Sequence, residues 1–132
     1  NEVDCQSKGL QAVPPGIPVD TAMLRLDFNK FKSLDATAFE DLGSVTYLGL
    51  EYVNSLQTLP SGVFAQLGQL KNLYLNSNVL ATLPLGVFDR LTQLDKLYLG
   101  TNQITSLPTT VFDRLTQLDK LYLGTNQITS LP

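Results

Sequence analysis

Leucines recur along the chain at a nearly constant interval. The first set is Leu24, Leu48, Leu73, Leu97 and Leu121, with spacings of 24, 25, 24 and 24 residues. A second leucine follows two residues after each of them, and an arginine, a glycine or a tyrosine separates the two. Alternation with a period of two is typical of a short strand that has one buried face. We therefore expect one short strand in each repeat, with its leucine pair turned into the interior.

The repeat extends beyond the leucines. Val87–Pro108 returns letter for letter as Val111–Pro132, and an asparagine follows each leucine pair. These asparagines are Asn29, Asn54, Asn78, Asn102 and Asn126. The pattern L-x-x-L-x-L-x-x-N-x-L is that of a leucine-rich repeat. It predicts a leucine-rich-repeat solenoid of the α/β horseshoe type, with a parallel β-sheet on the concave face and 3-10 or irregular turns on the convex face.

Two further columns of residues have structural interpretations. The asparagine amides are expected to form a ladder of hydrogen bonds to backbone groups where the chain turns away from each strand. Phenylalanines at spacings of 25, 24 and 24 are expected to stack as a spine on the convex side; they are Phe39, Phe64, Phe88 and Phe112. In one copy, three residues instead of two separate leucine from asparagine, which predicts a one-residue bulge near Tyr52 and Val53.

The ends of the repeat array predict a partial cap and an exposed face. Residues 1–20 are rich in proline and are expected to form an N-terminal cap, in which Cys5 has none of the partners that such caps hold. Residues 21–132 are expected to form five repeats with no C-terminal cap. The last repeat would then present an apolar face, which predicts a homo-oligomer. The residues expected at this contact are Leu118, Leu121, Leu123, Ile128 and Leu131.

The segment 86–108 closely resembles the repeat module of variable lymphocyte receptors, the leucine-rich-repeat antigen receptors of jawless vertebrates. The stretch 3–18 is similar to the latter half of their N-terminal cap. The resemblance implies an extracellular or cell-surface protein that binds a protein or carbohydrate antigen through its concave sheet. The ligand-binding positions that it implies are Arg25, Asp27, Tyr47, Glu51, Tyr52, Asn72, Tyr74, Asn76, Lys96, Tyr98, Lys120 and Tyr122. Against the family pattern, we expect no C-terminal cap and no membrane-anchoring stalk, and the last two repeats are identical from Val87 and Val111 onward.

Aromatic residues on the predicted concave face have two compatible interpretations. Tyr74, Tyr98 and Tyr122 form one column, and tyrosine is favoured in antigen-binding surfaces because it gives a large contact area at low entropic cost. The same three rings could also stack on one another across neighbouring strands. Met23, Tyr47 and Phe28 would add apolar contact area at the other end of this face. Phe28 could instead tuck under the N-terminal cap, which is the arrangement that we expect.

Composition and charge disfavour other classes of function. The net charge of −3 gives no electrostatic footprint for nucleic acid, and no apolar run approaches the roughly 18 residues of a membrane span. The chain has no histidine, which removes the commonest metal ligand and general base. Asp27 and Glu51 could lie on neighbouring strands, but an open face without a paired nucleophile disfavours acid–base catalysis. We expect no enzymatic activity and no cofactor.

Two hypotheses about function follow. The first is a binding module, antigen-receptor-like, that recognises protein or carbohydrate through the concave surface. The alternative is an engineered or truncated repeat scaffold that has no natural ligand and self-associates through its last repeat. The 22 identical residues of the last two copies favour the alternative, because they indicate a recent duplication or a consensus array. The varied first three repeats favour the binding module.

Overall fold

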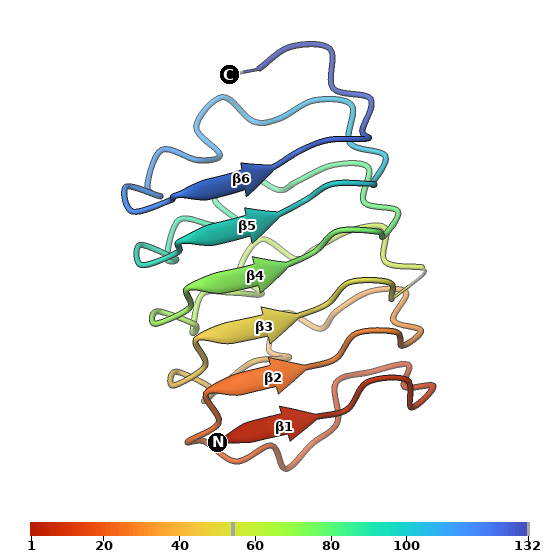
Figure 1. Ribbon diagram of the computed structural model, residues 1–132, viewed down its shortest axis with the longest axis vertical. Helices are drawn as coiled ribbons and strands as arrows, with labels where there is room; N and C mark the ends of the chain where they lie inside the picture. Colours follow the sequence, from red (N-terminus) through yellow and green to blue (C-terminus); the bar gives the residue numbers. More distant parts are fainter. Residues whose placement is uncertain (54, 132) are drawn as a thin grey trace.

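The computed structural model describes residues 1–53 and 55–131. These residues form six short strands and no helix. The strands are β1 (Glu2–Asp4), β2 (Met23–Arg25), β3 (Tyr47–Gly49), β4 (Asn72–Tyr74), β5 (Lys96–Tyr98) and β6 (Lys120–Tyr122). All six pair in parallel in the order of the sequence, so each strand hydrogen-bonds to the strand of the next coil. Figure 1 shows them stacked from the N-terminal end to the C-terminal end. The predicted leucine-rich-repeat solenoid is confirmed.

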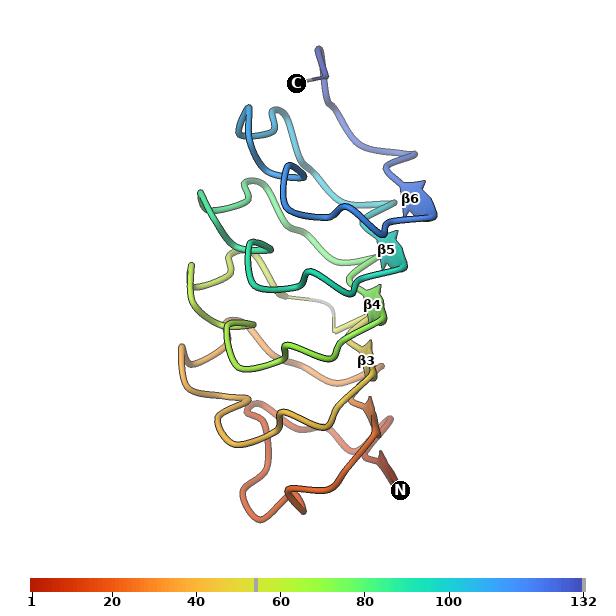
Figure 2. The ribbon, with the colours of Figure 1, turned by 90° about the vertical axis from the view of Figure 1, so that its left-hand side faces the viewer.

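The sheet lies on the concave side of the molecule. In Figure 2 the strands line one edge, which bows inward, and the return segments fan out on the opposite, convex edge. The return segments consist of turns closed by single backbone bonds, such as the Ala38 amide to the Asp35 carbonyl and the Leu91 amide to the Phe88 carbonyl. The expectation of irregular convex turns is met, because the return path is short and interrupted by proline and glycine.

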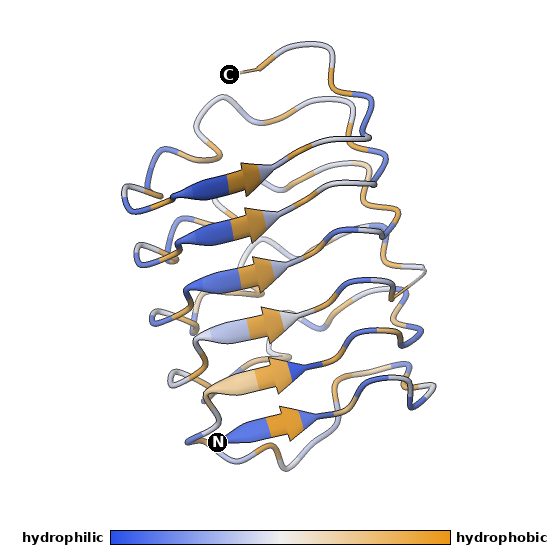
Figure 3. Ribbon diagram, in the orientation of Figure 1, coloured by the Kyte–Doolittle hydropathy of each residue, from blue (hydrophilic) through white to orange (hydrophobic). Residues whose placement is uncertain are grey.

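The core lies between the sheet and the return segments. The middle residue of each strand from β2 to β5 is a leucine with no exposed surface, and Figure 3 shows it as hydrophobic. The flanking residues are partly exposed, apart from the buried Gly49. The phenylalanine spine is confirmed: ring centroids are 6.1 Å apart for Phe39 and Phe64, 6.3 Å for Phe64 and Phe88, and 6.4 Å for Phe88 and Phe112. One coil alone cannot bury these side chains, so stacking of neighbouring coils supplies the stability.

The asparagines form the predicted hydrogen-bond ladder. The amide nitrogen of Asn102 donates to the carbonyls of Leu75 and Leu99, which belong to neighbouring coils, and its oxygen accepts from the amide of Leu80. Asn29, Asn78 and Asn126 repeat this arrangement. Each amide nitrogen donates to the carbonyl of the leucine three residues earlier and to one carbonyl of the preceding coil. The ladder thus satisfies the backbone groups that the turn leaves unpaired.

The extra residue of the irregular repeat lies beyond Tyr52. Tyr52 has a φ of 54°, and its counterparts Phe28, Ser77, Thr101 and Thr125 have φ values from 54° to 60°, so this coil keeps the common register up to that residue. The next residue, Val53, is fully buried at the position of the ladder asparagines. Asn54, which the sequence pattern assigned to the ladder, lies outside the described residues. The ladder position of this coil is therefore apolar.

The N-terminal residues add a strand of their own. β1 pairs with β2 in the register Val3 to Leu24. Leu10, Val13 and Ile17 pack, partly buried, against the core, as expected for residues that cover the first coil. Cys5 is a free thiol, partly buried beneath the same surface.

Candidate binding surface

A row of four tyrosines crosses the concave sheet. Tyr47, Tyr74, Tyr98 and Tyr122, here called the tyrosine ridge, have ring centroids 5.1, 4.3 and 4.7 Å apart in that order. The last two pairs are stacked with interplanar angles of 12° and 8°, and the first is tilted by 36°. The cross-strand stacking expected for the last three is confirmed. Tyr47 extends the row, although the sequence pattern placed only the other three tyrosines in one column.

Gly49 explains why Tyr47 reaches the ridge. Tyr74, Tyr98 and Tyr122 are the third residues of their strands, whereas Tyr47 is the first residue of β3 and Gly49 is the third. Because glycine adds no side chain beside Tyr74, the Tyr47 ring can approach the Tyr74 ring and the carboxylate of Asp27 can lie against Gly49. A Cβ atom at Gly49 would lie 2.6 Å from Oδ2 of Asp27, so this position also excludes any larger residue.

Arg25 continues the row toward the first coil. Its guanidinium carbon lies 5.1 Å from the centroid of the Tyr47 ring, within the range of a cation–π interaction. Its Nε atom donates to Oε2 of Glu2 at 2.8 Å. The hydrogen bond to Glu2 raises the pKa of Arg25, so the guanidinium stays charged. One continuous strip of cationic and aromatic surface therefore spans β2 to β6.

The ridge is both packed and accessible. Tyr122 is 49% exposed and the other three tyrosines are half-buried against one another. Burial raises the pKa of Tyr74 to about 12, with further contributions from Tyr98, Tyr47 and Glu51. Aromatic pairs of this kind contribute about 0.5–1.5 kcal/mol beyond the area that they bury. The ridge is thus a rigid surface whose rings need little ordering when a partner binds.

Polar side chains border the ridge along the N-terminal ends of the strands. Asn72, Lys96 and Lys120 are the first residues of β4, β5 and β6. Nζ of Lys96 lies 3.8 Å from Oδ2 of Asp95, and this solvent-exposed ion pair contributes little to stability. These side chains are positioned to contact a partner that covers the tyrosines.

Acidic and amide groups border the ridge on its other side, just beyond the C-terminal ends of the strands. The backbone amide of Glu51 donates to Oδ1 of Asp27 at 2.8 Å, and Nδ2 of Asn76 donates to Oε2 of Glu51 at 2.9 Å. Asp27 is only 4% exposed, and this burial raises the pKa of its carboxyl group. The carboxylate of Asp27 therefore connects two coils instead of facing solvent.

Two exposed aromatic rings lie on the turns after β2 and β3. Phe28 and Tyr52 stack at 5.1 Å with an interplanar angle of 4°, and they are 49% and 47% exposed. The expectation that Phe28 tucks under the cap is wrong, because its φ of 60° directs the ring outward onto Tyr52. A left-handed backbone is strained for bulky residues. The pair adds an exposed apolar surface beyond the sheet. The sequence singled out Tyr52 as a binding position but did not predict its contact with Phe28.

The apolar residues predicted for self-association lie in the last coil. Leu121 is 37% exposed, whereas its counterpart Leu97 is fully buried, and Leu131 is 72% exposed. Leu118, Leu123 and Ile128 are partly buried against the core. The structure brings these residues onto one coil, and their role in association stays a prediction.

No three metal-binding side chains are grouped in residues 1–53 and 55–131. Within the same residues, no helix has the length and apolar character to cross a membrane.

Comparison with known proteins identifies the family. Residues 21–80, 53–104 and 68–128 match the leucine rich repeat family, and the chain belongs to it. The chain is 38% identical over 77 residues to the leucine-rich repeat-containing G-protein coupled receptor 5A of Xenopus laevis, which covers 58% of this chain and 8% of that protein. It is also 38% identical over 77 residues to the platelet glycoprotein Ib alpha chain of Canis lupus familiaris, which covers 58% of this chain and 11% of that protein.

A third relative is the insulin-like growth factor-binding protein complex acid labile subunit of Mus musculus. It is 43% identical over 49 residues, which cover 37% of this chain and 8% of that protein. The chain therefore spans only a small part of the length of the three relatives.

Proposed function

We propose that this chain is an extracellular binding module that recognises a macromolecular partner through the tyrosine ridge. The observation that carries the proposal is the ridge itself, four stacked tyrosines with Arg25 at one end, held on a rigid sheet. Tyrosine and arginine are enriched among the residues that dominate binding energy. Their enrichment here supports a contact surface over a purely structural one.

A protein or carbohydrate antigen is the proposed partner class, as in the receptors that the repeat sequence resembles. Two of the relatives are named as a receptor and as a subunit of a growth-factor-binding protein complex. These names support an extracellular setting and a protein partner. The contacts that we propose are Arg25, Tyr47, Asn72, Tyr74, Lys96, Tyr98, Lys120 and Tyr122, with Glu51, Tyr52 and Asn76 at the border. Asp27 is left out because its carboxylate is buried.

The test is a screen of the purified chain against arrays of extracellular protein domains and glycans. Each saturable hit is measured again with Tyr98→Ala and with Arg90→Ala, an exposed residue of the return segment. We expect Tyr98→Ala to weaken binding by about tenfold or more and Arg90→Ala to leave it unchanged. Tyr98→Phe preserves the stacked ring and separates loss of contact from loss of packing. Hits that Tyr98→Ala leaves intact would overturn the proposal.

A second candidate function is self-association through the last coil. It is favoured by the uncovered Leu121, whose counterpart Leu97 is fully buried under the next coil. Light scattering over a range of concentrations, with and without reductant, tests it. A dimer or larger assembly that ignores reductant supports this function, and a monomer at every concentration excludes it.

A further inference from the structure

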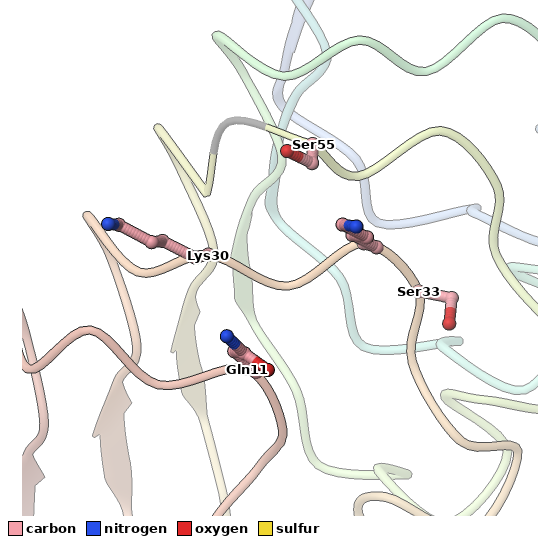
Figure 4. Close-up of a pocket in the computed structure, with 5 residues that line it drawn as sticks. Gln11, Lys30, Ser33 and Ser55 are labelled. Atoms are coloured by element: carbon pink, nitrogen blue, oxygen red, sulfur yellow. The ribbon is translucent and has the colours of Figure 1, made fainter.

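A polar hollow lies on the flank of the solenoid, where the chain leaves the sheet. It measures about 340 Å³ and is lined by Gln11, Lys30, Lys32, Ser33 and Ser55. These residues come from three consecutive coils. Figure 4 shows Gln11 and Ser55 on opposite sides of it, with Lys30 extended along the flank away from the other labelled side chains. The hollow is therefore formed by the stacking of coils and not by one loop.

The backbone fixes the positions of the two lysines. The amide of Lys30 donates to the carbonyl of Leu10 at 2.8 Å, which joins this coil to the one before. Phe31 is fully buried between Lys30 and Lys32, and both lysines are exposed. The side chains on either side of Phe31 are therefore both open to solvent.

The lining contains cations and hydrogen-bonding groups without a carboxylate. The five lining residues are two lysines, two serines and one glutamine. Among the described residues, the ion pairs within 4.0 Å join Arg25 to Glu2 and Lys96 to Asp95, so neither Lys30 nor Lys32 is neutralised in this way. In a chain with a net charge of −3, this is a local concentration of positive charge.

The same hollow recurs two coils further on without the charge. Gln57, Val79, Ala81 and Gln103 line a hollow of about 390 Å³. Val79 follows Asn78 by one residue and Ala81 by three, as Lys30 and Lys32 follow Asn29. The repeat therefore produces the cavity, and the first hollow differs from the second in having two lysines and two serines in its lining.

We propose that the hollow lined by Lys30 and Lys32 binds the sulfate groups of a sulfated carbohydrate chain. Lysines act as mobile point charges that suit an oxyanion on an open surface, and their four-carbon stems let the ammonium groups converge on it. Ser33, Ser55 and Gln11 can exchange hydrogen bonds with sugar hydroxyls. The lining offers no aromatic or branched aliphatic side chain, which disfavours the apolar body of a sulfated or phosphorylated peptide side chain.

The test measures binding of a sulfated dextran oligosaccharide by calorimetry at about 50 mM salt, where exposed charges are weakly screened. Unsulfated dextran and inorganic sulfate are the comparison ligands. The variant Lys30→Gln/Lys32→Gln removes both cations without touching the core. The matched control is Arg90→Gln/Arg114→Gln, which removes the same charge from exposed residues of the return segments. Melting temperatures of both variants check the fold.

We expect the first variant to bind the sulfated oligosaccharide about tenfold more weakly, which is the loss of about 1.4 kcal/mol. The control is expected to stay within about twofold of the parent chain. A gain-of-function variant, Val79→Lys/Ala81→Lys, places lysines at the second hollow and is expected to raise the number of bound oligosaccharides. Equal losses in the variant and its control would overturn the proposal, because they would indicate general charge attraction. Equal binding of unsulfated dextran would also overturn it, as would inorganic sulfate competing with the same affinity as the sulfated chain.

This proposal is independent of the function assigned to the tyrosine ridge. Tyr98→Ala is expected to leave binding of the sulfated oligosaccharide unchanged, and Lys30→Gln/Lys32→Gln is expected to leave partners of the ridge bound. The two variants therefore show which of the two proposals fails.

Discussion

Replacing Gly49 by alanine tests how the concave face is packed. The added Cβ atom would lie 2.6 Å from Oδ2, 2.8 Å from Oδ1 and 3.0 Å from Cγ of Asp27. The Asp27 side chain is short and buried, and its Oδ1 atom accepts a hydrogen bond from the amide of Glu51. It cannot move away without losing that bond. Gly49→Ala should therefore destabilise the folded chain.

The magnitude follows from two opposing contributions. Over-packing of a buried site costs about 1–3 kcal/mol. The lower backbone entropy of alanine in the unfolded chain offsets about 0.4–1 kcal/mol of that cost. The net loss in the free energy of unfolding is then about 1–2 kcal/mol, which for a chain of this size lowers the melting temperature by about 4–8 °C.

Urea denaturation followed by circular dichroism measures the effect. Gly68→Ala is the matched control, because a Cβ atom at Gly68 meets nothing within 4 Å and its φ is not positive. The double variant Asp27→Ala/Gly49→Ala completes a thermodynamic cycle. We expect the two substitutions to be coupled by about 1 kcal/mol, since Asp27→Ala removes the carboxylate that the new methyl group would meet. Equal stabilities for Gly49→Ala and Gly68→Ala, or additive effects in the cycle, would refute the described packing.

Three further predictions concern the turn after each strand. Asn102→Ala removes the side-chain hydrogen bonds of Asn102 to four backbone groups and should lower the free energy of unfolding by about 2–4 kcal/mol in urea denaturation; a loss below about 0.5 kcal/mol would contradict the ladder. Thr101→Asn should raise the melting temperature, because a β-branched residue at a φ of 54° is strained by about 1 kcal/mol and asparagine tolerates this region better; an unchanged or lower value would count against that strain. Burial raises the pKa of Asp27, so the folded chain binds this proton more tightly than the unfolded chain. Stability should fall as pH rises from 3.8 through the raised value. Asp27→Asn should remove that part of the pH dependence of the urea midpoint, and an identical pH profile in the variant would refute it.

The repeating part of the fold could be predicted from the sequence. Leucine, asparagine and phenylalanine recur at fixed intervals, and a period of 24 residues admits few ways to bury them. The spine of Phe64 and Phe88 and the ladder of Asn78 and Asn102 were predictable for that reason. Both depend on nearest-neighbour stacking, which the period itself defines.

The parts that escaped prediction are those where one repeat differs from the others. Tyr47 joins the ridge beside Gly49, which carries no side chain, and the same glycine lets the carboxylate of Asp27 lie against the sheet. Such pairings involve different columns of the repeat, which a count along one column does not compare. Lys30 and Lys32 occur in a single repeat and gave no periodic signal. Comparing the residues one and three positions after each ladder asparagine would have singled them out.

The most direct test of the central claim follows the tyrosine rings during binding. With isotope-labelled tyrosine, the ring signals of Tyr47, Tyr74, Tyr98 and Tyr122 can be recorded while a partner from the screen is titrated in. If the ridge is the binding surface, these four signals shift or broaden in proportion to the bound fraction, and Arg90→Ala does not alter the response. A partner that binds saturably while all four ring signals keep their positions would contradict the claim.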